Sequence, residues 1–370
     1  TGVQTCALPI LSPYGKDDEN IPDFFINNKG NKNLLLPRYP AGAHIDENTV
    51  PYLRRNADPK AWHSDFSLCR DIDKNLAYKI QKQAEEQMFK LIQKAIDLTG
   101  EKNIVISGGF GLNCVANYKY VKKFPGINFY IDPVAHDGGT AIGLARHAWH
   151  QYSRSVTPNK LSTLYLSTAP DYSQLDMLKE ATKIQVEDTN VNAVADLLDN
   201  GNIVAMFSGR AEGGPRALGN RSILFDPRRQ DGKEFVNIVK KREWFRPFAG
   251  SVLEEEANEW FDMAGMESSP HMMYAVDVRA DKVDKIPAVT HVDNTCRVQT
   301  VNKEQNQHYY DLIWAFKENT GVPVLFNTSF NLAGQPLVEN LVDAVLTIIN
   351  SDIKYLYLPE IGKLITHEKV

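Results

Sequence analysis

The sequence has few cysteines and lacks any long apolar run. Its four cysteines, Cys6, Cys69, Cys114 and Cys296, are scattered along 370 residues, and no two of them form a CxxC pair. This spacing argues against a disulfide framework and against a thiolate zinc site, and it favours a reducing cytoplasm. No stretch approaches the roughly 18 continuous apolar residues of a membrane-spanning helix. We therefore expect a cytoplasmic protein that does not span a membrane.

Several common catalytic signatures are also missing. The sequence contains no HExxH motif, no Walker A motif and no GxGxxG motif, and no spacing suggests a Ser-His-Asp triad. These absences argue against a zinc protease, a P-loop enzyme and a side-chain nucleophile. They favour chemistry that clamps anions and stabilises developing charge electrostatically.

The sequence has no excess of positive charge. Lys and Arg number 41 and Asp and Glu number 46, which gives a net charge of −5. Bulk charge therefore offers no support for a nucleic-acid partner, although a local basic patch is still possible.

The composition and length suggest two domains. Hydrophobic residues make up 43% of the chain, enough for two cores. At roughly 100–200 residues per domain, the length suggests two domains.

The first ten residues, TGVQTCALPI, look like the translation of a sequencing adaptor. We interpret residues 1–10 as an artefact of sequence assembly and exclude them from the fold. The native sequence would then start near Leu11, inside a longer reading frame, and Cys6 would not belong to the protein.

Periodicity and glycine turns divide the remaining chain into two α/β units. Residues 11–150 are expected to hold helices over 75–98 and 140–149 and strands over 103–107 and 127–131. The polar residues 151–163 form a candidate linker. Residues 164–370 are expected to hold helices over 191–199, 252–261 and 338–349, strands over 203–207, 322–326 and 353–358, and a polar loop over 327–331. Strand, glycine turn and helix in succession are typical of an α/β sheet with a ligand at its strand ends.

Two glycine-rich turns in the first unit are candidates for phosphate binding. Gly108 and Gly109 follow a predicted strand and precede Asn113, while Asp137 and Gly138 open the Ala-rich helix. Glycine lets the backbone approach a phosphate closely, and free N–H groups at a helix start favour anions. A carboxylate at such a loop can hold a metal ion. Each glycine pair alone is equally consistent with a tight turn, and Asp137 with a helix N-cap.

Five arginines lie close together in the segment 209–229, GRAEGGPRALGNRSILFDPRR. They are Arg210, Arg216, Arg221, Arg228 and Arg229. The glycines and proline between them exclude a solvated helix face. Rigid turns that hold guanidinium groups suit bidentate recognition of phosphate or carboxylate. A basic surface loop is the alternative.

The segment 240–251, KKREWFRPFAGS, interleaves basic and aromatic residues. This mixture can indicate nucleic-acid stacking. We favour instead aromatic side chains that pack in a core, with Lys240 and Arg246 directed into a pocket. Pro247 restricts the backbone of Arg246.

Two later segments place polar side chains on or after strands. The segment 291–301, HVDNTCRVQTV, suggests a strand edge that presents Arg297, or an ordinary strand, and His291 is more typical of a structural hydrogen-bonding residue. Asn327 and Ser329 follow a predicted strand, where hydroxyl and amide groups can bind phosphate or a nucleotide without adding charge. A turn without a ligand is the alternative. We expect these separate segments to converge on one polyphosphate site.

In their order along the chain, six motifs resemble the O-carbamoyltransferases of antibiotic and nodulation-factor biosynthesis. They are SGGFGLNCVAN, DPVAHDGGTAIGLA, GRAEGGPRALGNRSILFDPR, KKREWFRPFAGS, HVDNTCRVQTV and PVLFNTSFN. The resemblance runs from about Ser12 to the C-terminus. It implies an α/β fold, with the C-terminal half of an actin-like (ribonuclease H-like) ATPase domain over 11–150. A YrdC-like α/β domain with a twisted open sheet would follow over 164–370.

The resemblance also implies an activity. In this family, carbamoyl phosphate and ATP form carbamoyl-adenylate and pyrophosphate in the YrdC-like module. The intermediate then moves to the actin-like module, where iron is the metal and a hydroxyl of a small molecule accepts the carbamoyl group. Carried over by motif, the catalytic residues would be Arg216, Lys240, Arg246, Arg297 and Ser329. Substrate or nucleotide would contact Gly108, Gly109, Asn113, Gly138, Arg221 and Asn327, and Asp137 would be one ligand of iron or another divalent metal.

One departure from the family concerns the transfer step. The family's His-x-x-x-His metal motif lies upstream of this sequence, and His44 and His63 do not reproduce it. We therefore expect an N-terminally truncated fragment with an incomplete transfer site, whose acceptor the sequence does not name. Two other functions stay open. A tRNA threonylcarbamoylation-type factor shares both folds but is disfavoured by the acidic balance. A non-catalytic nucleotide-binding protein is disfavoured by the retained Arg and Lys residues.

Overall fold

The structure, a computed structural model, describes residues 9–21, 23–27, 35–37, 71–154, 161 and 163–367. The chain forms two compact units. The first comprises Thr1–Val105, Tyr118–Tyr130 and Glu243–Arg246, and the second comprises Ile106–Asn117, Ile131–Arg242 and Pro247–Val370. Residues 1–8 of the adaptor-like segment, together with His44, His63 and Cys69, lie outside the described residues. The interpretations placed on them, and the predicted domain boundaries, stay predictions.

A long helix is the main element of the first unit. α2 runs over Asp71–Thr99, which confirms the helix predicted over 75–98. Gly100 ends it in the left-handed conformation (φ +69°), which glycine adopts without strain. Its buried side chains include polar ones. Gln81 and Glu85 are buried and hydrogen-bonded to each other (2.6 Å), and Lys119 pairs with Glu85 (2.7 Å), whereas Leu91 is 60% exposed.

Shorter elements accompany this helix. They are η1 (Ser12–Tyr14), the antiparallel pair β1 (Phe25–Asn27) and β2 (Leu35–Pro37), the paired strands β3 (Asn103–Ile106) and β4 (Asn128–Ile131), and α3 (Cys114–Lys123). Phe89 of α2 packs edge-on against Tyr120 and Phe124 of the α3 segment, with ring centroids 5.8 and 6.2 Å apart. Aromatic packing therefore fixes α2 against α3 within the first unit.

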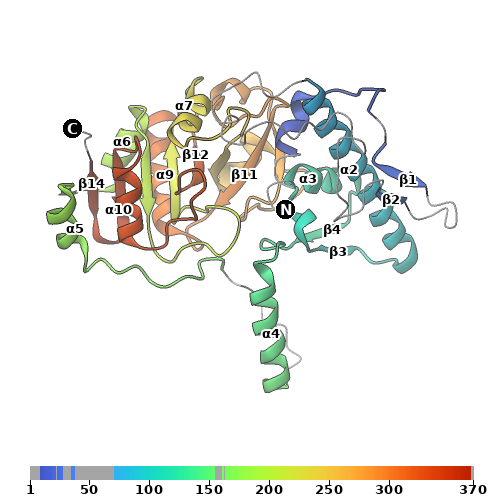
Figure 1. Ribbon diagram of the computed structural model, residues 1–370, viewed down its shortest axis with the longest axis horizontal. Helices are drawn as coiled ribbons and strands as arrows, with labels where there is room; N and C mark the ends of the chain where they lie inside the picture. Colours follow the sequence, from blue (N-terminus) through green and yellow to red (C-terminus); the bar gives the residue numbers. More distant parts are fainter. Residues whose placement is uncertain are drawn as a thin grey trace. The chain divides into compact units, whose positions relative to one another are not determined.

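The second unit is built on one ten-stranded mixed sheet (Figure 1). Its strands, in spatial order, are β5 (Gln185–Asp188), β14 (Lys363–Thr366), β13 (Tyr355–Leu358), β6 (Val204–Phe207), β7 (Arg221–Phe225), β12 (Val324–Ser329), β8 (Ala249–Leu253), β11 (Thr295–Val301), β10 (Ala275–Val278) and β9 (Phe261–Asp262). The β13–β6 and β8–β11 pairs are parallel, and the other neighbours are antiparallel. The central strands β6, β7 and β8 are buried throughout. The α/β class expected from the sequence is confirmed as a mixed α/β fold with a large open sheet.

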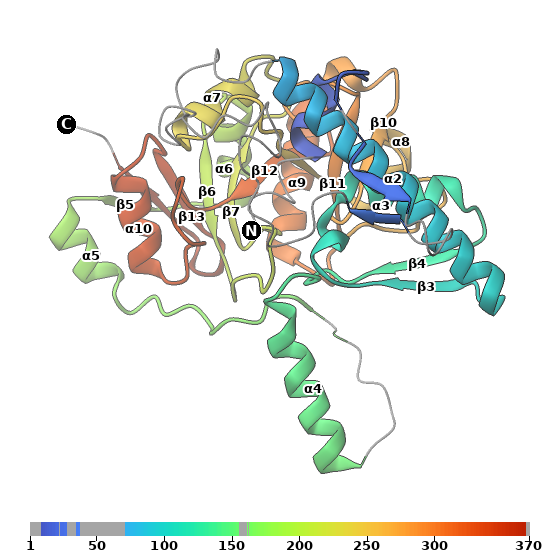
Figure 2. The same cartoon turned by 45° about the vertical axis from the view of Figure 1, so that its right-hand side comes forward.

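Helices connect these strands along the chain, and the first of them projects away from the sheet (Figure 2). They are α4 (Gly139–Ser153), α5 (Leu175–Thr182), α6 (Val191–Asp199), α7 (Gly232–Val239), α8 (Ala257–Trp260), α9 (Gln307–Thr320) and α10 (Leu341–Ile349), with the short 3₁₀ turns η4 (Gly109–Leu112), η5 (Glu254–Glu256), η6 (Val283–Lys285) and η7 (Pro359–Ile361). Among the described residues, no helix is both long enough and apolar enough to cross a membrane. The helix predicted from 338 starts later, at Leu341, because Asn340 and Asp343 form a capping box.

Two predictions for this unit need correction. The helix expected over 252–261 is shorter: residues 254–260 are helical as η5 and α8, whereas residues 252–253 end β8 and residue 261 begins β9. The loop expected over 327–331 is a strand as far as Ser329, because β12 pairs with β7 on one side and with β8 on the other. There long-range strand pairing overrides the local composition, which favoured a polar turn.

Gly219 lies where a side chain has no room. Its φ is +113°, and an added Cβ would stand 2.3 Å from Cδ1 of Tyr309 in α9. We expect Gly219→Ala to lower the free energy of unfolding by roughly 2–5 kcal/mol, from backbone strain and overpacking together. Urea denaturation would measure the loss. Gly334→Ala is the matched control, because Gly334 also has a positive φ (+78°) but open space around it. Equal losses in the two variants would show that the contact with Tyr309 is unimportant.

Candidate active site on the central strands

Three strands of the sheet place the predicted site residues on one face. Arg297 of β11 and Asn327 of β12 both pair with Ala249 of β8, which lies between them. Residues in such a row point to the same side, and two strand spacings separate Arg297 and Asn327 by roughly 9–10 Å between Cα atoms. Ser329 lies two residues further along β12, so it shares this face. The structure therefore brings Arg297, Asn327 and Ser329 together.

A buried amide network ties the arginine-rich loop to these strands. Nδ2 of Asn327 donates to the carbonyl of Ala217 (3.3 Å), and Nε2 of Gln299 donates to the carbonyl of Leu218 (2.9 Å). Ser251 of β8 bridges the two amides, since its hydroxyl donates to Gln299 (2.8 Å) and accepts from Asn327 (3.0 Å). The loop directly after Arg216 is therefore held against β11 and β12.

Glu212 organises the same loop from within, and the sequence analysis missed it. Its carboxylate accepts the backbone N–H groups of Leu218, Asn220 and Arg221 at 2.7, 2.7 and 3.2 Å. Burial raises the pKa of this carboxyl, even though the three N–H bonds favour its charged form. An acid near the start of a segment with five arginines was the available signal. Its backbone partners could not be deduced without the fold.

Arg216 keeps most of its hydrogen-bonding capacity. Among the described residues its guanidinium makes one long hydrogen bond, to the carbonyl of Leu112 (3.4 Å), and its Nε is buried without a partner. The buried Oδ1 of Asn327 also has no partner among those residues. Unsatisfied buried polar atoms are rare and call for an explanation. A bound anion at Arg216 would supply acceptors for its free N–H groups.

Lys240 and Ser329 are in direct contact. Lys240 is 1% exposed at the end of α7, and its Nζ donates to the Ser329 carbonyl, to the Ser329 hydroxyl (3.4 Å) and to Oδ1 of Asn331 (3.2 Å). Burial lowers the pKa of Lys240 well below its usual value. An anion arriving beside Ser329 would offset this effect by stabilising the ammonium form.

The five arginines of the motif differ in their surroundings. Arg221 is fully buried, donates to the carbonyls of Ser208, Gly209, Asn220 and Glu339, and stacks 3.7 Å from the Phe207 ring centroid. Arg228 pairs with Asp226 and Asp199, and Arg229 pairs with Asp231. Arg210 is exposed. The ligand-binding role predicted for Arg221 stays a prediction, and the structure gives this side chain a packing role.

The first glycine turn forms a compact 3₁₀ turn in the second unit. Gly108 has φ +92° and precedes η4, which begins at Gly109. Asn113 is 5% exposed, and its side chain accepts the backbone N–H of Ala116 (3.1 Å) at the start of α3. The structure thus gives Asn113 a capping role, and its predicted contact with nucleotide stays a prediction.

The second glycine turn begins α4. Gly138 is its N-cap, and the carbonyl of Asp137 accepts from the Thr140 hydroxyl (2.6 Å). The Asp137 side chain is exposed, and within the described ranges no three His, Cys, Asp or Glu residues gather as a metal site would require. The described residues alone therefore do not make up a metal site. The metal role of Asp137 stays a prediction, and no step below depends on it.

Arg246 and His291 belong to different units of the chain. Arg246 belongs to the first unit, where its guanidinium forms a two-point ion pair with Glu243. His291 contacts the Phe248 carbonyl and the Thr295 hydroxyl, each at 3.1 Å, which agrees with the structural role expected for it. Burial lowers the pKa of His291 to about 4.

This buried histidine predicts acid sensitivity of the fold. The unfolded chain takes up a proton on His291 near pH 6.5, whereas the folded protein does so only near pH 4. Stability from this group is therefore complete above pH 6.5 and falls as the pH drops towards 4. The expected loss is on the order of 3 kcal/mol. Urea unfolding at several pH values would measure it. His291→Gln should flatten this part of the profile, and an unchanged slope would contradict the assignment.

Two family models match the chain. Residues 8–146 match the family described as carbamoyltransferase N-terminus, and residues 195–363 match carbamoyltransferase C-terminus. The chain belongs to the carbamoyltransferase family. All the predicted site residues from Arg216 to Ser329 fall within the C-terminal match.

Two nodulation proteins are similar to much of this chain. It is 38% identical to nodulation protein NolNO of Sinorhizobium fredii over 76% of the chain and 42% of that protein. It is 36% identical to nodulation protein NolO of Bradyrhizobium diazoefficiens over 93% of the chain and 62% of that protein. The chain thus spans about half the length of these relatives.

Among solved structures, the crystal structure of full-length HypF in its phosphate- and nucleotide-bound form aligns with 45% of this chain and 21% of its own, at 16% sequence identity. Its TM-score of 0.30 is too low to carry an argument.

Proposed function

We propose that the second unit of this carbamoyltransferase-family chain activates a carbamoyl group with ATP, forming carbamoyl-adenylate from carbamoyl phosphate. Most of residues 164–370, for which the sequence resemblance implies a YrdC-like module, belong to this unit. One observation carries the proposal. The amide network of Asn327, Gln299 and Ser251 holds the Arg216 loop against the strands that bear Arg297 and Ser329.

The residues of this site suit a reaction between anions. Carbamoyl phosphate and ATP are both negatively charged, so a site must reduce their repulsion before one can attack the other. Arg216 and Arg297 supply fork-shaped donors for phosphoryl oxygens, and Lys240 supplies a buried amine beside Ser329. None of these groups needs to act as a nucleophile.

The chemical balance defines what the site must release. Carbamoyl phosphate carries a phosphoryl group that carbamoyl-adenylate lacks, so water must displace inorganic phosphate and leave carbamate. A carbamate oxygen then bonds to the α-phosphorus of ATP, and the bond from that phosphorus to the bridging oxygen breaks to release pyrophosphate. Negative charge builds up on the leaving pyrophosphate. The role of Arg216, Lys240 and Arg297 is to stabilise that charge, as fixed donors do in other transfers.

Transfer to a small-molecule hydroxyl would complete the reaction in the longer protein. We assign that step to the actin-like part, with its metal, and the acceptor stays unnamed. The catalytic role of Arg246 stays a prediction from its motif.

Exchange of labelled pyrophosphate into ATP tests the adenylation step. We expect exchange by the purified 370-residue chain only when carbamoyl phosphate is present, because the reverse reaction needs carbamoyl-adenylate. Exchange without carbamoyl phosphate would show that the nucleotide is activated towards another group. Binding of both substrates without exchange would favour a non-catalytic nucleotide-binding protein. Binding of tRNA with exchange driven by threonine and bicarbonate would favour a threonylcarbamoylation-type factor.

A further inference from the structure

Glu212 closes the loop that carries Arg216. It lies four residues before this arginine, is 6% exposed and is the one acidic residue of the segment 209–225. A single carboxylate oxygen, Oε1, accepts three backbone N–H groups from the later part of the loop: those of Leu218 (2.7 Å), Asn220 (2.7 Å) and Arg221 (3.2 Å). The two ends of the loop are therefore joined through one buried carboxylate.

The three N–H groups that meet at Glu212 form an anion site of the kind that binds phosphate in other proteins. In this chain the carboxylate of Glu212 itself fills the site. Gly219 makes the arrangement possible, because with φ +113° its own N–H donates to the Ser222 hydroxyl (3.0 Å), while the N–H groups on either side of it donate to Glu212. The path of the backbone after Arg216 thus depends on an acceptor at the place of Glu212.

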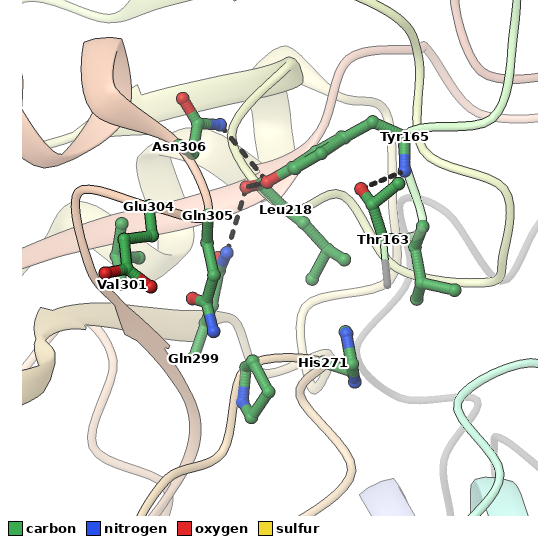
Figure 3. Close-up of a pocket in the computed structure, with 11 residues that line it drawn as sticks. Thr163, Tyr165, Leu218, His271, Gln299, Val301, Glu304, Gln305 and Asn306 are labelled. Carbon is green, nitrogen blue, oxygen red and sulfur yellow. Dashed lines mark hydrogen bonds between the residues drawn. The ribbon is translucent and has the colours of Figure 1, made fainter. Parts of the chain in front are cut away.

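Leu218 connects this closed loop to its surroundings. Its N–H donates to Glu212, and its carbonyl accepts from the Tyr165 hydroxyl and from Nε2 of Gln299, each at 2.9 Å (Figure 3). Leu218 is two residues after Arg216. Three hydrogen bonds therefore fix the backbone directly beyond the arginine, and Glu212 accepts one of them.

Glu212 does not neutralise Arg216. Three other arginines pair with a carboxylate two or three residues away in the chain: Arg228 with Asp226, Arg229 with Asp231 and Arg246 with Glu243. Among the described residues, Arg216 makes only its long hydrogen bond to a carbonyl (3.4 Å). Because the Glu212 carboxylate accepts from the backbone instead, the charge of the nearby guanidinium stays available to an anion from outside.

We propose that Glu212 is a positioning residue for anion binding by Arg216. It fixes the turn that bears the arginine by accepting the three N–H groups, and it leaves the guanidinium to a phosphoryl group because it is itself bound there. The proposal rests on the anion site of the proposed function, but it concerns a residue that touches no substrate. It requires an acceptor of the right reach at this place, and it requires no negative charge.

Binding of inorganic pyrophosphate to the 370-residue chain, measured by isothermal titration, tests this role. Glu212→Gln keeps an oxygen acceptor at the same reach, so its affinity should stay within about threefold of the wild type. Glu212→Asp keeps the charge, but its carboxylate is one methylene too short for all three N–H groups. Its affinity should fall on the order of 10–100-fold, the effect of a lost charged hydrogen bond at Arg216.

A control variant and a double variant separate positioning from a general loss of structure. Asp343→Asn should leave pyrophosphate affinity unchanged, because Asp343 also accepts a backbone N–H but does so at the start of α10. In an Arg216→Ala background, Glu212→Asp should lower the affinity by no more than about twofold, since the contact that it positions is already gone. Circular dichroism on the same preparations would refer each affinity to folded protein.

Several outcomes would overturn the proposal. One is a folded Glu212→Gln protein that no longer binds pyrophosphate, a result that can be obtained even if Glu212→Asp does not fold. Another is tighter binding by Glu212→Asp than by Glu212→Gln, which would mean that charge matters more than reach. Fully additive losses with Arg216→Ala, or a wild-type chain that does not bind pyrophosphate, would also contradict it.

Failure of this inference can be told apart from failure of the proposed function. Carbamoyl phosphate-dependent exchange with equal pyrophosphate affinity in the wild type and Glu212→Asp would overturn the positioning role and leave the function intact. Pyrophosphate binding that Glu212→Gln keeps and Glu212→Asp loses, in a chain without exchange, would support the positioning role and contradict the adenylation.

Discussion

Replacing Arg216 with alanine is expected to lower carbamoyl phosphate-dependent pyrophosphate exchange on the order of 10²–10³-fold, the usual effect of losing one fixed donor to developing charge. The protein should still fold. Among the residues that the structure describes, Arg216 makes a single long hydrogen bond, to Leu112 (3.4 Å), so the free energy of unfolding should change by less than about 1 kcal/mol. Exchange kinetics and urea denaturation on the same preparation would measure both effects.

Arg216→Lys refines this test. Lysine keeps the positive charge but loses the planar fork, so a bidentate phosphate contact predicts that exchange stays well below the wild-type rate. Arg229→Ala serves as the control, because Arg229 is half-exposed and its ion pair in the described part of the chain is with Asp231 (2.6 Å). It should leave exchange unchanged. If the Arg216→Ala variant exchanged pyrophosphate at the wild-type rate, Arg216 would not belong to the site.

Replacing Arg221 with alanine is expected to lower the stability of the fold, and to lower exchange only through that loss. This side chain is fully buried, and its removal leaves the carbonyls of Ser208, Gly209 and Glu339 without their donor and opens a cavity beside Phe207. We expect a loss of roughly 3–5 kcal/mol in the free energy of unfolding. Thermal and urea denaturation would measure it, and any loss of exchange should follow the loss of folded protein.

The two replacements, Arg216→Ala and Arg221→Ala, are expected to differ in their effects on exchange and on stability. They are five residues apart in one motif, so sequence alone gives them similar roles. A stable Arg221→Ala protein that fails to exchange would show that the guanidinium meets the substrate, as the motif implied. A stable protein with normal exchange would show that the carbonyl contacts contribute little.

Much of the fold follows from local patterns in the sequence. The helix over Asp71–Thr99 has a long periodic segment and a glycine at its end, and the strands β3, β4 and β6 are short β-branched or apolar runs beside glycine or polar turns. Other elements were missed, among them α9, β8 and β14. The β8 segment AGSVL has small residues because Ala249 and Gly250 lie between two neighbouring strands in a crowded part of the sheet.

The sequence by itself determined the α/β class, the family, and the residue types that an anion site needs: arginines in rigid turns, a lysine after a helix, and amides and hydroxyls at a strand end. Only the tertiary structure decided which of these side chains face a ligand and which hold the loop. Arg216 and Arg221 differ because Glu212 folds the loop between them, and Asn327 lies opposite Ala249 because β12 joins the sheet between β7 and β8. Strand order and register depend on pairing between residues far apart in the chain, and local sequence carries little information about such pairing.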